Sequence, residues 1–389
     1  MSAWPYVPIG AAARQVVRPV APTPGTILRQ LGVRLWGEGA YERESIDGAA
    51  TKYATLYTAR ANDIVVNKIW ARNGSVAVVP AALDGAVGSG EFPMFTADRT
   101  RLDPRWMHWL TKTKDFWARC DEKSRGTSGK NRIRPEQFLA IEIPLPPLPV
   151  QQRLVARVDT ISGEVASARG IAAEVSAESD ALLEAHLARV FDKAIAGDRA
   201  ALSKQVVLER GKFSHRPRND PRFFGGAHPW IQIGEIESSV RAITSWTETL
   251  NDSGLAISKK FPAGTVLVSI AATIGAVGIL AFDCCVPDSI VAATPRPGVS
   301  PDFLYYYFRF VRAHLESVAP QSAQKNVNLQ ILGSLPFPLI SLAEQHRIVA
   351  ELDALQAEID ALKATQATSR AELDALLPAV LDRAFSGAL

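Results

Sequence analysis

One segment of the chain occurs twice, and this repeat constrains the fold more than any other feature. The segment IPLPPLPVQQRLVARVD runs from Ile143 to Asp159, and the segment FPLISLAEQHRIVAELD runs from Phe337 to Asp353. The copies are offset by 194 residues, half of a chain of 389 residues. A repeat with so long a period contains a whole domain and a whole helix, rather than one unit of a solenoid. We therefore expect two similar halves related by a pseudo-twofold plan.

A helical pattern follows each copy, with seam positions that alternate in steps of four and three residues. The first seam is Leu154, Val158, Ile161, Val165, Ala168, Ala172, Val175, Ser179 and Leu182, and the second is Ile348, Leu352, Leu355, Ile359, Leu362, Gln366, Ser369, Leu373, Leu376 and Val380. Helices with matching seams can pack against each other, and small or polar central positions permit close approach. We therefore expect an antiparallel coiled coil of helices over 151–198 and 341–389.

The two helical regions end alike but differ in length. They end in VFDKAIAG, from Val190 to Gly197, and in VLDRAFSG, from Val380 to Gly387, an offset of 190 residues instead of 194. The first region is therefore four residues longer, which corresponds to a stutter of about one helical turn. We also expect Pro378 to bend or restart the second helix, because proline cannot complete the helical hydrogen-bond pattern.

The segments between the helices repeat more faintly. The run DIVVNKIWARNGSVAVV, which begins at Asp63, aligns with GTVLVSIAATIGAVGIL, which begins at Gly264. In each run two β-rich stretches surround an aligned glycine, Gly74 or Gly275. This pattern predicts one β-hairpin in each half of the chain.

A helix start follows each predicted hairpin. Asp103-Pro104 and Ser300-Pro301 each combine an N-cap residue with proline at the first helical position. Helical spacing predicts that the aromatic residues after them pack in the core instead of forming a base-stacking surface. These residues are Trp106, Trp109, Phe116, Phe303, Tyr306, Tyr307 and Phe310. We therefore expect an α+β protein with mixed α/β domains over 1–150 and 199–340.

Charge alternates in sign along the chain. Residues 1–150 carry 20 Lys+Arg against 14 Asp+Glu, and residues 199–340 carry 14 against 10. The helical segments are acidic, with 5 Lys+Arg against 8 Asp+Glu over 151–198 and 4 against 8 over 341–389. Basic domains separated by acidic helices suggest that the domains meet a polyanion and that the helices meet protein or solvent.

The sequence contains no strong catalytic signature. It lacks a phosphate-binding loop ending in Lys-Ser/Thr, a GxSxG elbow, an HExxH motif and a dinucleotide fingerprint. Its three cysteines and six histidines show neither a disulfide framework nor metal-ligand spacing. An apolar run of membrane-spanning length and a signal-peptide pattern are also missing. These features favour a cytoplasmic binding protein that carries no cofactor or metal and does not bind a membrane.

Several motifs resemble the specificity subunits of type I restriction-modification systems. They include the proline-rich lead into QQRLV at Gln151 and EQHRIV at Glu344, each opening a long helix. The run HPWIQIGEI at His228, the predicted hairpin after Gly264 and the C-terminal LLPAVLDRAFSG are also similar to that family. The order of domain, helix, domain and helix extends the resemblance over essentially the whole chain.

The resemblance implies two target-recognition domains, over 1–150 and 199–340, that each read one half of a split double-stranded DNA sequence. It implies that the helix pair separates them and binds two methyltransferase subunits, which ATP-dependent restriction subunits join. The chain itself would be non-catalytic, with S-adenosylmethionine, ATP and Mg on the partner subunits. Two alternatives are a single-chain DNA methyltransferase or nuclease, and a coiled-coil scaffold that binds only proteins.

Candidate DNA-binding residues lie in predicted loops and hairpin turns, where Arg, Lys and amide side chains can reach phosphates or base edges. In the first half they are Lys68, Arg72 and Asn73 at the hairpin, and Lys123, Arg125, Thr127, Ser128, Lys130 and Arg132 in a basic glycine-containing segment. In the second half they are Lys212, Arg216, Arg218, Ser269, Thr273, Ser322, Gln324, Lys325 and Asn326. The alternative for each group is an ordinary solvated loop.

Overall fold

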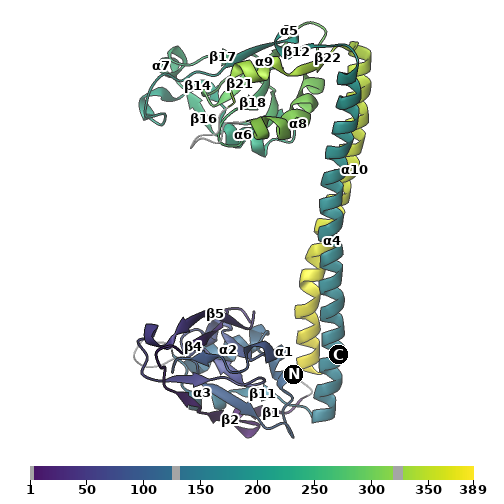
Figure 1. Cartoon of the computed structure of the whole chain (residues 1–389). Coiled ribbons are helices and arrows are strands. Elements are labelled where there is room, and N and C mark those ends of the chain that lie inside the picture. Colours follow the sequence, from purple (N-terminus) through teal and green to yellow (C-terminus); the bar gives the residue numbers. More distant parts are fainter. Residues whose placement is uncertain (1–3, 125–131, 319–326) are drawn as a thin grey trace. The chain divides into compact units, whose positions relative to one another are not determined.

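A computed structural model describes residues 4–124, 132–318 and 327–389. The chain divides into two units, one of residues 1–172 with 366–389 and the other of residues 173–365. Each unit contains one α/β domain together with parts of two long helices, α4 (Leu148–Ala196) and α10 (Leu342–Ser386) (Figure 1). None of the helices in the described part of the chain is both long and apolar enough to cross a membrane.

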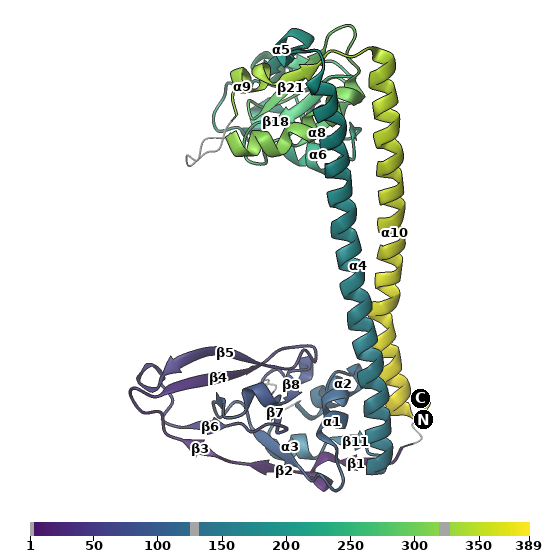
Figure 2. The same ribbon diagram turned by 45° about the vertical axis from the view of Figure 1, so that its right-hand side comes forward.

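The described residues of the first unit's domain form three sheets and three α-helices. The strand orders are β1 (Tyr6–Pro8)-β11 (Glu142–Pro144), β2 (Ala13–Val16)-β10 (Met94–Ala97)-β7 (Ile64–Val66)-β8 (Val76–Val78), and β3 (Pro19–Val20)-β6 (Leu56–Thr58)-β9 (Val87–Gly88)-β4 (Ile27–Val33)-β5 (Ala40–Asp47). The helices are α1 (Pro104–Leu110), α2 (Lys114–Ser124) and α3 (Pro135–Leu139). In this domain the β4–β5 hairpin projects away from α4 (Figure 2).

The domain of the second unit repeats this topology. Its strand orders are β12 (Arg199–Ala201)-β22 (Pro336–Pro338), β13 (Val206–Arg210)-β21 (Ile290–Pro295)-β18 (Val266–Ser269)-β19 (Val277–Leu280)-β15 (Ala242–Ile243), and β16 (Glu248–Leu250)-β14 (Phe224–Trp230)-β20 (Cys284–Cys285)-β17 (Lys260–Phe261). The helices are α5 (Leu202–Gln205), α6 (Ile233–Ser238), α7 (Asp252–Ala256), α8 (Pro301–Val318) and α9 (Leu329–Ser334).

Most strands of the two domains correspond, although β3 of the first domain has no equivalent in the four-stranded sheet of the second. β4 pairs with β9 in parallel and with β5 in antiparallel, just as β14 pairs with β20 in parallel and with β16 in antiparallel. The main difference lies between the strands of that antiparallel pair, where the second domain carries α6 and β15 and the first carries only the turn of residues 34–39. The expected α+β class and internal repeat are thereby confirmed.

Both predicted hairpins are present, as β7–β8 and β18–β19. The aligned glycines adopt left-handed backbone conformations, with φ of 75° at Gly74 and 78° at Gly275. A side chain at either position would also collide with a neighbour: a Cβ at Gly74 would lie 2.8 Å from the ring of Trp117, and one at Gly275 would lie 2.7 Å from the side chain of Arg312. Conformation and space therefore both favour glycine in these two turns.

The long helices run antiparallel, as predicted. In the second unit Lys363 Nζ lies 2.5 Å from Asp180 Oδ1, and Glu351 Oε1 lies 2.8 Å from His186 Nε2. Residues further along α4 therefore contact residues that come earlier in α10, which is the order of an antiparallel pair. In the first unit Arg169 of α4 pairs with Asp374 of α10.

The predicted seam fails at one end of α4 and also at Leu362 and Leu376 of α10, which are 40% and 43% exposed. Leu182 is 55% exposed, whereas its neighbour Leu183 is 4% exposed and belongs to the core of the second domain. Buried positions continue from Ser179 in steps of four, through Leu183 to Leu187 and Phe191. The helix does not restart at Pro378, one of the two expected outcomes, because α10 continues through this residue to Ser386.

Most of the predicted aromatic core is buried. Trp106, Phe116, Phe303, Tyr306 and Tyr307 are each 0–1% exposed. The side chain of Trp106 is fixed further, because its Nε1 donates a hydrogen bond to the Pro144 carbonyl at 3.0 Å. These rings pack between the sheets and the long helices, so they are core residues and not platforms for bases.

Candidate nucleic-acid interface

The same pair of side chains joins each domain to a long helix, and both lie in the repeated segment. Gln151 of α4 is 0% exposed, and Gln345 of α10 is 1% exposed. Gln151 accepts a hydrogen bond from the Asp103 backbone N–H at 3.0 Å and donates to two backbone carbonyls, at 2.8 and 2.7 Å. Gln345 accepts from the Ser300 N–H at 2.8 Å and donates to two carbonyls, at 2.8 and 3.1 Å. Each glutamine therefore holds the start of the domain helix that Asp103 or Ser300 precedes.

The last residue of each repeated segment provides a second contact. Asp159 accepts hydrogen bonds from Arg105 at 2.5 Å and from the Trp109 ring N–H at 2.7 Å. Asp353 likewise accepts from an arginine and an aromatic residue, here Arg241 and the hydroxyl of Tyr306, the latter at 2.6 Å.

The hydrogen bonds also set the ionisation of these groups. Burial alone would raise the pKa of the Asp353 carboxyl, but the hydrogen bonds from Arg241 and Tyr306 outweigh this effect and lower that pKa below its ordinary value. Burial, together with the hydrogen bond to Asp353, raises the pKa of the Tyr306 phenol. The anchor is therefore an ionised carboxylate held by a neutral phenol and a guanidinium at neutral pH.

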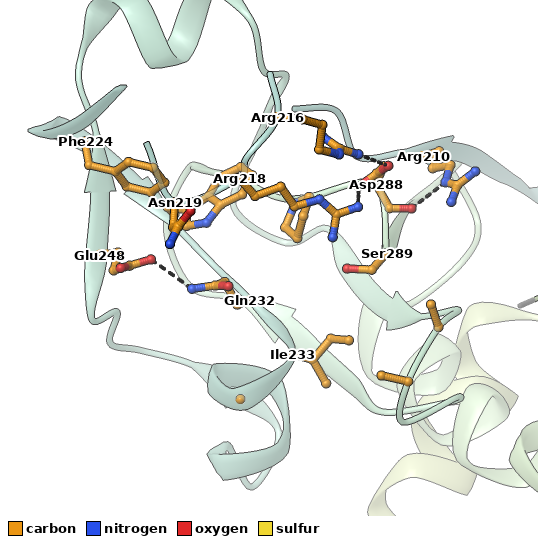
Figure 3. A pocket seen from close by; sticks show the side chains of 15 residues that line it. Arg210, Arg216, Arg218, Asn219, Phe224, Gln232, Ile233, Glu248, Asp288 and Ser289 are labelled. Carbon is orange, nitrogen blue, oxygen red and sulfur yellow. Dashed lines mark hydrogen bonds and ion pairs between the residues drawn. The ribbon is translucent and has the colours of Figure 1, made fainter. Parts of the chain in front are cut away.

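A cavity of about 1090 Å³ opens in the second domain (Figure 3). Its walls come from the end of β13 and the loop after it, from β14, the start of α6 and β16, and from the loops before β19 and β21. The lining residues are Arg210, Arg216, Arg218, Asn219, Phe224, Trp230, Gln232, Ile233, Gly234, Glu248, Ala271, Ala272, Pro287, Asp288 and Ser289. Of the residues predicted from sequence, the structure brings Arg216 and Arg218 to this cavity.

One carboxylate organises the basic wall of the cavity. Asp288 pairs with Arg216, at 3.0 Å, and with Arg218, and its backbone carbonyl accepts a hydrogen bond from Arg210 (Figure 3). Arg216 is held further, because its Nη1 donates to the carbonyls of Phe213 and His215 at 2.7 and 2.8 Å. Its side chain therefore stabilises the loop, whereas Asp288 is the one partner of Arg218 in the described part of the chain.

The opposite wall offers amide and carboxylate groups. Gln232 Nε2 donates to Glu248 Oε2 at 2.9 Å, and both side chains are exposed (Figure 3). Asn219 is exposed as well, and the Ser289 hydroxyl faces the same cavity. Guanidinium, amide and carboxylate groups are the ones that distinguish base edges in the major groove of DNA. Sequence patterns did not identify Gln232, Glu248 or Asp288, because they lie in separate segments that only the fold brings together.

Three other candidates of the second domain do not line this cavity. Lys212 is exposed on the loop after β13. Ser269 is 0% exposed, and its hydroxyl donates to the Thr273 carbonyl and accepts from the Ala276 N–H at 2.9 Å. Ser269 therefore stabilises the β18–β19 turn and is not accessible to a ligand, which corrects the expectation from sequence. Thr273 is half-buried in the same turn.

The first domain has a smaller cavity, of about 220 Å³, in the topologically equivalent place. Residues of β4, β5, β6, β9, the loop before β6, the β7–β8 turn and the loop before β10 line it, including Arg43, Tyr53, Ile69, Trp70 and Glu91. Tyr53 and Trp70 are 55% and 45% exposed, which no sequence pattern indicated. Arg132, a predicted residue, lies beside this cavity and pairs with Glu91 at 2.8 Å.

Three of the remaining candidates of the first domain lie around the β7–β8 turn. Lys68 is half-buried, and its carbonyl accepts a hydrogen bond from the Ile133 N–H at 2.9 Å. Arg72 and Asn73 are half-buried in the 3-10 turn η3 (Ala71–Asn73). Lys123 lies in the last turn of α2.

The other candidates of both domains fall outside the described residues. They are Arg125, Thr127, Ser128, Lys130, Ser322, Gln324, Lys325 and Asn326.

The described residues show no metal-binding cluster and no activated thiol. No group of three His, Cys, Asp or Glu side chains within them could hold a metal ion. Cys120, Cys284 and Cys285 are buried, and burial raises the pKa of all three thiols. Such thiols remain protonated at neutral pH and are poor nucleophiles.

Known proteins are similar to this chain in both sequence and fold. The family model of the type I restriction modification DNA specificity domain matches residues 210–369. The type I restriction enzyme EcoBI specificity subunit of Escherichia coli is 25% identical over 279 residues, a match that covers 64% of this chain and 58% of that subunit.

Solved structures extend the similarity over the whole chain. One chain of a type I R-M system has a TM-score of 0.78 at 25% identity, covering 99% of this chain and 98% of its own length. The HsdS subunit from Thermoanaerobacter tengcongensis has a TM-score of 0.65 at 25% identity, and the match covers 99% of this chain and 97% of that subunit. Together with the internal repeat and its matched anchors, these findings show that the chain is similar over its whole length to type I restriction-modification specificity subunits.

Proposed function

We propose that this chain is the DNA sequence-specificity subunit of a type I restriction-modification complex and that it recognises a bipartite duplex target. One observation carries the proposal: two domains with the same topology and the same glutamine and aspartate anchors present cavities with different linings. Equivalent placement with different chemistry is what a protein needs to read two different half-sites. The basic character of both domain segments favours DNA as the ligand, because phosphates attract Lys and Arg.

Each domain would read its half-site through the residues around its cavity. In the second domain an arginine can bind guanine, and Gln232 or Asn219 can bind adenine, through paired hydrogen bonds to the base edge. In the first domain Arg43 and Arg132 lie near exposed aromatic residues instead. Two domains with such different linings would give a target whose halves differ in sequence.

The chemistry would belong to partner subunits. Two methyltransferase subunits would bind along α4 and α10, and restriction subunits would join them, so that S-adenosylmethionine, ATP and Mg act on those chains. The helical segments support a protein partner because they are acidic and expose large apolar residues. Ile171 and Leu182 of α4 are 59% and 55% exposed, and Leu362 and Leu376 of α10 are 40% and 43% exposed.

Sequencing of methylated DNA tests this function directly. We compare cells that express the chain with its methyltransferase partner, the partner alone, and the chain alone. The expected result is one split sequence motif that is methylated only when both proteins are present. Methylation by the chain alone would establish the single-chain enzyme instead. An unchanged methylation pattern, with no selective binding of duplex DNA by the purified complex, would favour the protein scaffold.

A further inference from the structure

Each domain places one acidic residue at the same point of its topology, at the wall of its cavity. Asp288 lies two residues before β21, and Glu91 lies three residues before β10. β21 and β10 occupy the same position in their sheets, between β13 and β18 in one domain and between β2 and β7 in the other. The chain thus carries a carboxylate at matching sites, although the surrounding residues differ.

Both carboxylates pair with an arginine that is more exposed than they are. The side chain of Asp288 is 29% exposed and that of its partner Arg218 is 45% exposed. Glu91 is 32% exposed and its partner Arg132 is 51% exposed. In each pair the carboxylate side chain is therefore less accessible to solvent than the arginine side chain.

We infer that Asp288 and Glu91 are matched positioning residues, which hold Arg218 and Arg132 ready to contact bases in the two half-sites. This inference rests on the proposed recognition of bipartite DNA. A guanidinium has five N–H donors, so an arginine held by a carboxylate keeps donors free for the O6 and N7 acceptors of guanine. Holding the side chain also removes part of the entropy cost of ordering it when DNA binds.

The carboxylate also limits binding to DNA of the wrong sequence. An unpaired arginine attracts any phosphate, whereas a carboxylate beside it lowers the net positive charge of the site. Exchange of the carboxylate contact for DNA is favourable only when the bases offer acceptors in the right places. Loss of the carboxylate should therefore weaken binding to the target and strengthen binding to unrelated DNA, a combination that general destabilisation of the domain does not produce.

Of two neighbouring arginines, Arg222 serves as the control and Arg216 does not. Arg216 shares Asp288 but is also bound to two backbone carbonyls, so its loss should lower the stability of the loop. Arg222 pairs with Asp220 at 2.7 Å on the same loop and does not line the cavity. Arg222→Ala removes one positive charge from this loop without touching the carboxylate–arginine pair under test.

The experiment measures binding of the complex of this chain and its methyltransferase subunits to three duplexes. The first duplex carries the intact sequence of the methylated motif. The second and third carry the same sequence with its first half or its second half scrambled. Circular dichroism and thermal unfolding of each complex show whether a variant is folded. Arg218→Ala and Arg132→Ala should each lower affinity for the intact target by about 10- to 100-fold, the range expected for a lost bidentate base contact.

The two acidic residues should then act on different halves. Asp288→Asn should reduce discrimination against one scrambled half by about tenfold or more, and Glu91→Gln should do the same for the other half, whereas Arg222→Ala should change neither ratio. The inference is overturned if the unmodified complex discriminates and folded Asp288→Asn and Glu91→Gln complexes discriminate equally well, or if both variants affect the same half. An unmodified complex that binds all three duplexes equally would overturn the proposed function as well.

Discussion

Replacement of Gln151 by alanine tests whether the repeated segment holds the first domain on its helix. The side chain is fully buried and makes three hydrogen bonds, with the Asp103 N–H and with the carbonyls of Arg101 and Pro146. Gln152, the next residue, is exposed on the same helix. The two glutamines differ in burial and partners but not in residue type, so the second is a matched control.

The expected loss follows from the hydrogen bonds. Each contributes about 0.5–1.5 kcal/mol net, and groups left buried without a partner add to the cost. Removal of the Gln151 side chain should therefore lower the free energy of unfolding of the first unit by about 2–4 kcal/mol. Gln152→Ala should change it by less than about 0.5 kcal/mol, as is usual for exposed positions.

Urea unfolding of the full chain, followed by tryptophan fluorescence, measures this difference. Six of the eight tryptophans lie before residue 150, so the signal reports mainly on the first domain. With an m-value of about 2 kcal/mol per M, the midpoint for Gln151→Ala should fall by about 1–2 M. Gln151→Glu keeps the size of the side chain but loses both donors, so it should be no better than alanine. Equal midpoints for Gln151→Ala and Gln152→Ala would refute the role assigned to the buried glutamine.

Three further predictions concern a turn and two ionisable groups. Gly74 and Gly85 both have a left-handed φ, but only at Gly74 would a Cβ collide with Trp117. In urea unfolding, Gly85→Ala should therefore destabilise the first unit by roughly 1 kcal/mol, and Gly74→Ala should destabilise it by more. Burial, assisted by nearby cations, lowers the pKa of His108 to about 4, so stability should be lost as pH falls from about 6.5 to about 4, by about 3 kcal/mol. His108→Asn should abolish most of that pH dependence, and an unchanged profile would contradict it. The lowered pKa of Asp353 contributes stability above about pH 4 that is lost as pH falls through the folded value, so unfolding midpoints of the protein and of Asp353→Asn should converge in acid.

Local rules found the parts of the structure that depend on neighbours in sequence. The turns at Gly74 and Gly275 and the helix starts at Asp103 and Ser300 were predicted from glycine, proline and N-cap residues. These features arise from backbone conformation over a few residues. The repeat itself located the anchors, because Gln151 and Asp159 align with Gln345 and Asp353, but it did not reveal what those side chains contact.

The heptad rule failed where α4 meets something other than its partner helix. A heptad assumes that one stripe of the helix faces one other helix. Near its C-terminal end, α4 packs Leu183, Leu187 and Phe191 into the same core as Phe303 of α8. The stripe turns toward the domain in steps of four, which exposes Leu182. Such a shift depends on the position of the domain and is not encoded in the spacing of the helix alone.

The candidate interface was predictable in composition but not in detail. A run of arginines after β13 indicated a basic loop. Both Arg216 and Arg218 line the cavity, but only Arg216 also holds the loop through backbone carbonyls. The carbonyls of Phe213 and His215 account for that division, because Asp288, which lies 70 residues from Arg218, pairs with both arginines. Contacts over such distances in sequence depend on sheet topology, which residue patterns do not specify.

The division between anchors and cavity linings explains how one fold could serve different half-sites. Changes to Gln345 or Gln151 would leave buried backbone groups without partners, at a cost that is a large share of the stability of a domain. Changes to Gln232, Asn219 or Glu248 affect exposed side chains, which usually alter stability by less than about 0.5 kcal/mol. The residues that fix each domain on its helix are therefore separate from those that would contact bases. Substitutions in one cavity could thus change one half of the target while the attachment of both domains, and the recognition of the other half, remain unaltered.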